Sequence, residues 1–172
     1  MPKAMVDYAK LLDEEKARRD SAIANAEAQR KREIELVAFF RSVEIALGME
    51  MAKANQELKR RGAPLIEGPF RPGKIGQERE EQIELSFGNR RPACRLTLES
   101  IARQIGLSRV KVELLDDSNE VASRMHYLLE GESADVKAFK PLVEGFPDRG
   151  WVCSPEEIAQ EIVPGIIRGR FA

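Results

Sequence analysis

The chain has 172 residues, of which 42% are hydrophobic and 33% are charged, and its formal net charge is −1. A chain of this length and composition is enough for one globular domain, or for a small domain with an extended arm. Residues 1–62 carry 13 Lys/Arg against 11 Asp/Glu, and residues 63–172 carry 15 against 18, so strong nonspecific binding to nucleic-acid phosphates is not expected from either part.

The sequence predicts a cytoplasmic protein without membrane segments. No apolar run approaches the length of a membrane-spanning helix, and the N-terminus lacks the apolar core of a secretory signal. The two cysteines, Cys94 and Cys153, are far apart and do not form a disulfide-scaffold pattern. We expect them to be reduced thiols in the core.

Residues 1–32 are predicted to form a charged helical arm. Between Lys3 and Arg61 there is no proline and only one glycine, and oppositely charged residues lie four apart, as in Glu15 and Arg19. Large apolar residues are sparse here, so we expect an arm that is partly exposed and available for a protein contact. Asp20-Ser21 is a candidate cap that would split the arm into two helices.

Residues 33–61 are predicted to form a second, much more apolar helix. Apolar residues recur at steps of three and four, which places them along one helix face. The apolar stripe is wider than a coiled-coil seam, so one side is expected to pack on the protein's own sheet and the other on a partner. The predicted partner-binding face consists of Leu36, Phe40, Val43, Leu47 and Met51. A core helix of a monomer is the alternative.

The chain after this helix predicts a linker and then a sheet. Gly62-Ala63-Pro64 is a helix stop, and residues 62–76 are rich in proline and glycine, which is typical of a connection. From residue 82 the apolar period changes to two, which predicts strands within 82–153. Gly88-Asn89 and residues 116–119 are predicted turns. Further short strands are expected around 136–143 and 151–153.

The C-terminal part predicts a helix over 155–163. Ser154-Pro155-Glu156-Glu157 is a capping box with proline at the first helical position, and Pro164-Gly165 is expected to end the helix. The resulting fold class is α+β, with a long N-terminal helix, an antiparallel sheet of about four to five strands and a C-terminal helix. Residues 33–172 are expected to form a single domain behind the arm.

Residues 97–115 (TLESIARQIGLSRVKVELL) resemble the helix-turn-helix of bacterial transcription regulators of the lactose-repressor type. In that family a small residue, a turn glycine and an aliphatic residue have the spacing that Ala102, Gly106 and Val112 have here. The resemblance implies that Ser108 caps a recognition helix and that Arg109 and Lys111 face the major groove.

The same segment also has a second interpretation. Residues 109–114 alternate apolar and polar side chains as a strand does, and acidic residues follow at Glu113, Asp116 and Asp117, which suits a phosphate backbone poorly. On this interpretation a strand to Leu98 and a strand from Ser108 flank a short helix at 99–104.

The sequence favours a non-enzymatic interaction or adaptor protein that self-associates, as a homodimer, or docks a protein partner through its N-terminal helix. A helix-turn-helix regulator that uses Ser108, Arg109 and Lys111 is the alternative, with nucleic acid less favoured than protein. A third class is a ligand-binding protein or enzyme with a pocket between the long helix and the sheet. No catalytic residue, metal ligand or cofactor is predicted, because the single histidine, His126, is far in sequence from both cysteines and no flanking signature supports a Cys–His nucleophilic pair.

Overall fold

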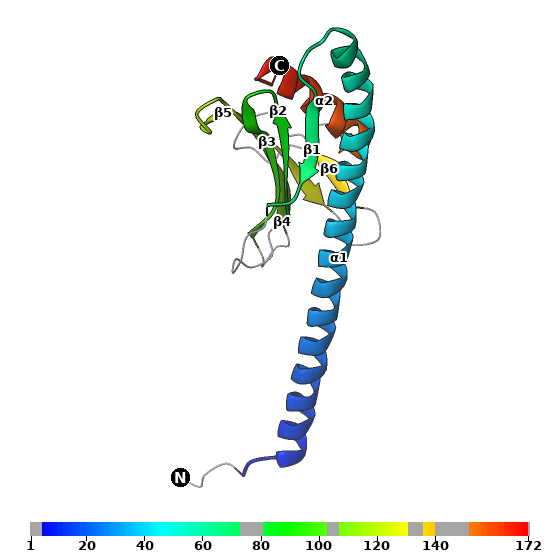
Figure 1. Ribbon diagram of the computed structural model, residues 1–172. Helices are drawn as coiled ribbons and strands as arrows, with labels where there is room; N and C mark the ends of the chain where they lie inside the picture. The colour runs from blue at the N-terminus through cyan, green and yellow to red at the C-terminus, as the bar shows by residue number, and fades with distance from the viewer. Residues whose placement is uncertain (1–4, 73–80, 103–106, 131–135, 140–151, 172) are drawn as a thin grey trace. The chain divides into compact units, whose positions relative to one another are not determined.

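The computed structural model describes residues 5–72, 81–102, 107–130, 136–139 and 152–171 (Figure 1). The chain divides into two compact units, Met1–Ile34 (unit 1) and Glu35–Ala172 (unit 2). Helix α1 (Tyr8–Arg60) is continuous and carries the chain from the first unit into the second. The split expected at Asp20-Ser21 is therefore wrong, because a strong run of helix formers continues through it. That residues 33–172 form a single domain stays a prediction.

Unit 2 contains an antiparallel sheet in which each strand pairs with the next along the chain. The described residues include seven strands: β1 (Ile66–Phe70), β2 (Gln82–Phe87), β3 (Arg90–Ala102), β4 (Leu107–Leu115), β5 (Val121–Glu130), β6 (Lys137–Phe139) and β7 (Val152–Cys153). The α+β class and the antiparallel sheet are confirmed, but the strand count is higher than the four to five expected.

Strand β1, which the sequence did not predict, lies in the segment that was predicted to be a linker. Its sequence, Ile66-Glu-Gly-Pro-Phe70, has no clear period of two, so no local pattern indicates a strand. It forms because β2 supplies a pairing edge, with Ile66 opposite Phe87 and Glu67 opposite Ser86. Proline and an irregular register confine β1 to the edge of the sheet.

Segment 97–115 contains strands β3 and β4 where the resemblance implied two helices. The pairing is continuous from Cys94 opposite Leu114 to Ser100 opposite Ser108. The short helix expected at 99–104 is also wrong over its described residues, since β3 extends to Ala102. Cross-strand pairing outweighs the helical spacing of the local sequence. Gly106, which carried much of the resemblance, lies outside the described residues.

The turns that the sequence predicted are present. Gly88, with φ of 60°, lies in the turn between β2 and β3. Between β4 and β5, Oδ1 of Asp116 accepts hydrogen bonds from the backbone N–H of Ser118 at 2.9 Å and of Glu120 at 3.0 Å. These bonds explain why an acidic and polar cluster gives a tight connection there.

One continuous core joins the sheet, the C-terminal part of α1 and helix α2 (Pro155–Arg168). Figure 1 shows both helices on the same side of the sheet. Inward side chains of β2 to β5 alternate with outward ones, as in β4, where Val110, Val112 and Leu114 are fully buried. Core residues on α2 include Ile158, Ile162 and Ile166. The strands, with their apolar period of two, and the helices, with apolar steps of three and four, thus bury their apolar sides against each other.

A side-chain amide joins α1 to the edge of the sheet. Asn55 accepts a hydrogen bond from the backbone N–H of Ile66 at 2.9 Å, and its Nδ2 donates to the carbonyl of the same residue at 2.9 Å. The amide therefore satisfies both backbone groups that Ile66 would otherwise leave unpaired at the start of β1.

Helix α2 begins as the sequence predicted and ends later. Ser154 caps it by accepting from the N–H of Glu157 at 3.2 Å, but the helix continues through Pro164 to Arg168, where it was expected to end at 163. Arg90 donates to the carbonyl of Ile166, and Gly169 caps the end in a left-handed conformation. Burying Ile166 in the core favours the extra turn despite the proline.

We predict that Leu47→Ala destabilises unit 2 by about 3 kcal/mol, because the fully buried side chain leaves a cavity between α1 and the sheet. Ile45→Ala on the same helix is the matched control, since Ile45 is 67% exposed, and its effect should stay within about 0.5 kcal/mol. Urea unfolding followed by circular dichroism measures both. Equal effects would mean that α1 does not cover the sheet with this face.

Candidate interaction surface

The five residues predicted to bind a partner lie in the core of unit 2. Their exposed fractions run from 0% to 8% in Leu36, Phe40, Val43, Leu47 and Met51. A partner on this face would have to displace the protein's own sheet. The sequence could not distinguish the two sides of the wide stripe, because periodicity identifies an apolar face and not what covers it.

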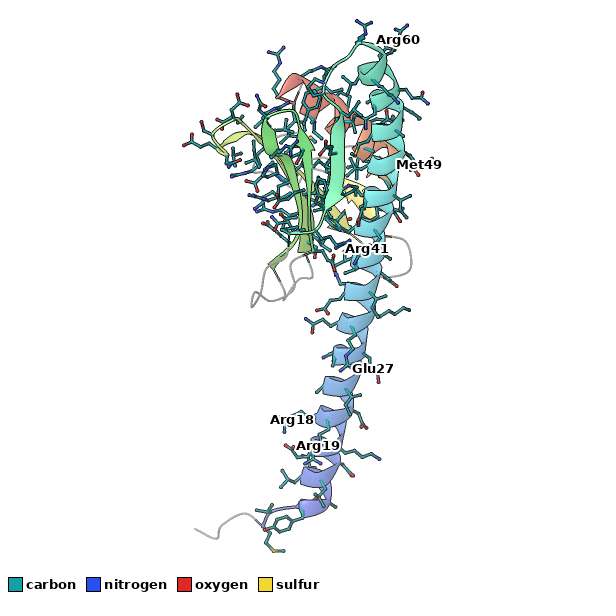
Figure 2. The ribbon with its side chains drawn as sticks, in the orientation of Figure 1. Arg18, Arg19, Glu27, Arg41, Met49 and Arg60 are labelled. Atoms are coloured by element: carbon teal, nitrogen blue, oxygen red, sulfur yellow. The ribbon has the colours of Figure 1, made fainter. Side chains whose placement is uncertain are left out.

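The opposite side of α1 within unit 2 carries exposed apolar residues. Ile45 is 67% and Met49 is 65% exposed, and Ala38 and Ala52 share their side of the helix. Figure 2 shows Met49 on the side of α1 that faces away from the sheet. Two large side chains separated by a single turn make a small patch, which is ordinary for a protein surface.

Beside this patch, a group of four charges ties α1 to the chain around β1 and β2. Arg71 binds Glu44 at 2.6 Å and Glu81 at 2.7 Å, and Arg41 lies 3.4 Å and 3.5 Å from the same two carboxylates. Partial burial, followed by repulsion from Glu81, raises the pKa of Glu44. The two positive and two negative charges balance, so this group is a structural connection and not a charged docking surface.

Unit 1 differs from unit 2 because its helix has no core. None of the described side chains at 5–34 is buried, and large apolar residues such as Tyr8 and Leu12 are 68% and 67% exposed. An isolated helix gains little stability from its own hydrogen bonds, and most helices in proteins are stabilised by packing an apolar face. The arm is thus a helix with an apolar surface that nothing in the described chain covers.

Six residues on one side of the arm form a line, which we call the arm seam. Its six positions alternate in steps of four and three, the spacing that keeps residues on one side of a helix facing a second helix. The arm seam consists of Tyr8, Leu12, Glu15, Arg19, Ala22 and Ala26. Sequence reasoning missed it because only large apolar residues were followed, and here alanines and one pair of opposite charges fill four of the six positions.

The two charged positions of the arm seam have different surroundings. Arg18 donates from both Nε and Nη2 to Oε2 of Glu15, at 3.3 and 2.9 Å. The sequence had suggested that Glu15 pairs with Arg19, four residues on. Among the described residues Arg19 has no hydrogen-bond or ion-pair partner, and its side chain is exposed (Figure 2). Oε1 of Glu15 and the guanidinium of Arg19 are therefore available on the same face.

The three residues of the DNA-binding alternative lie on strand β4. Ser108 is 4% exposed. Arg109 and Lys111 lie on the outer face of the sheet, where each binds Glu99 at 2.7 Å. No recognition helix forms there, and both cations already have carboxylate partners. Desolvation opposes ionisation of Glu99, but hydrogen bonds from Lys111 and Arg109 outweigh it and lower its pKa.

The same neutralisation extends across the outer face of the sheet. Glu84, Arg95, Glu113 and Arg124 lie opposite one another on successive strands β2 to β5. Arg95 lies 3.7 Å from Glu84, and Arg124 lies 3.3 Å from Glu113, which is only 6% exposed. Opposite charges alternate here, although the buried Nε of Arg95 makes no hydrogen bond among the described residues, so a phosphate backbone would meet no excess of positive charge.

Potential catalytic groups are used structurally. The buried hydroxyl of Tyr127 donates to Oε2 of Glu161 at 3.1 Å, and burial, followed by the charge of Glu161, raises the pKa of Tyr127. Burial also raises the pKa of the Cys94 thiol, which is the opposite of what a nucleophile needs. Cys94 points into the core while His126 lies on the outer face of β5. The described residues include no group of His, Cys, Asp and Glu that could hold a metal ion.

Comparisons with protein-family models, curated proteins and solved structures find no match to this chain. Across the described residues, the helices lack the apolar length that a membrane crossing requires.

We predict that Glu99→Gln destabilises unit 2 by about 1 kcal/mol near neutral pH, because it removes the negative charge that faces Arg109 and Lys111 and replaces one of the two accepting oxygens with an amide NH2 group. The folded state lowers the pKa of Glu99, so its charge contributes stability above the unfolded-state pKa, and this contribution is lost as the pH falls through the folded-state pKa. The difference from wild type should therefore shrink towards acid pH. Urea unfolding at several pH values tests this, with the exposed Glu67→Gln as control; a difference that grows in acid would contradict the assignment.

Proposed function

We propose that this protein is a non-enzymatic interaction protein whose N-terminal arm pairs, along the arm seam, with an α-helix of another polypeptide. The observation that carries the proposal is a helix without a core, in which every described side chain at 5–34 is at least partly exposed. On one side of this helix, Tyr8 and Leu12 begin a line of six residues with a 4-3 spacing. Unit 2 would be the folded body that the arm joins to its partner.

Burial energetics supports a helical partner. Tyr8, Leu12 and Ile23 are each more than half exposed, and complete burial of such a side chain contributes roughly 1.5–3 kcal/mol. A second helix covers a 4-3 line along its whole length, whereas a flat surface would contact only part of it. Self-association and docking of a different protein both remain within this proposal.

Interaction fits the rest of the described chain better than catalysis or DNA binding. The strongly perturbed groups, Cys94 and Tyr127, are buried and shifted towards their neutral forms. The outer face of the sheet is charge-balanced, and the segment that resembled a recognition helix is a strand. A cytoplasmic location stays a prediction.

We predict that a photoreactive residue at position 12 captures a protein partner in the native cell, while the same residue at position 17 captures much less. Leu12 lies on the arm seam, and Ala17, five residues on, lies on the opposite side of α1. Mass spectrometry of the cross-linked products identifies the partner and the contacted segment. The proposal would be wrong if neither position gave a product, or if both gave the same products in equal amounts.

A further inference from the structure

We infer that the partner of the arm seam is the arm of a second copy of this chain, running antiparallel, with the two-fold axis level with Ala17. This inference rests on the proposed function and specifies its partner. In that register the six seam residues pair completely with one another. The layers are Tyr8 with Ala26, Leu12 with Ala22 and Glu15 with Arg19, and the two-fold axis repeats each of them.

Side-chain volume supports this arrangement. Two of the three layers place a large side chain opposite an alanine, Tyr8 with Ala26 and Leu12 with Ala22. Large-with-small pairing fills each layer at a similar interhelical distance, as close packing between two helices requires. A parallel dimer in register would instead place Tyr8 against Tyr8 and Ala26 against Ala26, so that some layers would be too wide and others empty.

Charge supports the same arrangement independently. Glu15 of each copy lies opposite Arg19 of the other, so the two-fold axis creates two ion pairs. Arg18 already occupies Oε2 of Glu15, and the described chain leaves Oε1 and Arg19 without a partner. The parallel alternative would oppose Glu15 with Glu15 and Arg19 with Arg19, and like charges in a helix interface select against it.

The pairing of the seam residues also favours one antiparallel register over its neighbours. A shift by one heptad in one direction would place Arg19 opposite Ala22 and Leu12 opposite Gln29. A shift in the other direction would place Tyr8 opposite Arg19 and Leu12 opposite Glu15. Both shifts bury a charge without a partner, which is costly, whereas the register centred on Ala17 pairs every charge on the seam.

The contact is short and its expected strength is modest. Residues 8–26 span about 27 Å of helix at 1.5 Å per residue. Leu11 and Ile23 border the seam on opposite sides and add apolar surface, being 44% and 58% exposed. We therefore expect reversible dimers at roughly micromolar concentration.

Charge reversal in the full-length protein tests the inference. Glu15→Arg or Arg19→Glu alone creates two like-charge layers and should weaken dimerisation at least about tenfold in sedimentation equilibrium. The double variant Glu15→Arg/Arg19→Glu restores opposite charges and should return the dimer to within about threefold of wild type. Asp13→Arg, an exposed reversal off the seam, is the matched control and should leave dimerisation unchanged.

Cysteine pairing tests the direction of the helices. Chains carrying Leu12→Cys and chains carrying Ala22→Cys should form a disulfide-linked dimer when mixed and oxidised, and neither should do so alone. The native thiols give little background, because Cys94 and Cys153 are 0% and 7% exposed. Disulfides formed by each variant alone would indicate a parallel pair and overturn the inference, as would their absence from the mixture.

The outcomes separate this inference from the proposed function. A wild-type protein that remains monomeric up to roughly 100 μM overturns the second-copy partner. Capture of a different protein at position 12 would then keep the proposed function, whereas no capture would remove both. If the single charge-reversal variants dimerised as tightly as wild type, or if the double variant dimerised as weakly as the single variants, the copies would not meet through Glu15 and Arg19.

Discussion

The structure of unit 2 depends on covering the apolar face of one antiparallel sheet. Strands β2 to β5 alternate so regularly that a continuous apolar surface results, and an open sheet of this kind is stable only when a second layer removes that surface from water. The C-terminal part of α1 supplies one part of the layer through residues such as Phe40 and Leu47, which are fully buried. Helix α2 supplies another part, and its extra turn past Pro164 follows from the same requirement.

The polar contacts of unit 2 serve this two-layer arrangement. Asn55 satisfies the backbone of Ile66 at the sheet edge, Arg90 binds the end of α2, and Arg71 joins two carboxylates beside α1. On the outer face, opposite charges on neighbouring strands neutralise one another. These contacts thus join the helices to the sheet and neutralise charge among the described residues of unit 2.

The arm uses the spacing that buries α1 in unit 2, but none of its described side chains is buried. Its seam is less apolar than a strong coiled coil, because Glu15 and Arg19 occupy central positions. Charged residues in a helix interface reduce affinity but reject partners and registers that leave them unpaired. A pattern of this kind suits a reversible contact of defined geometry, as the proposed pairing of two arms requires.

The sequence by itself determined the elements whose signals are local. Steps of three and four predicted α1, period-two alternation predicted β2, β4 and β5, and Ser154-Pro155 predicted the start of α2, because each pattern reflects the geometry of a single element. Only the tertiary structure decided the features that depend on contacts with residues distant in the chain. It made a strand of the irregular β1 segment, extended β3 through residues that resembled a helix, and buried Leu36 to Met51 while leaving Ile45 and Met49 outside. The physical reason is that pairing edges and covering layers come from residues distant in the chain, which no local period records.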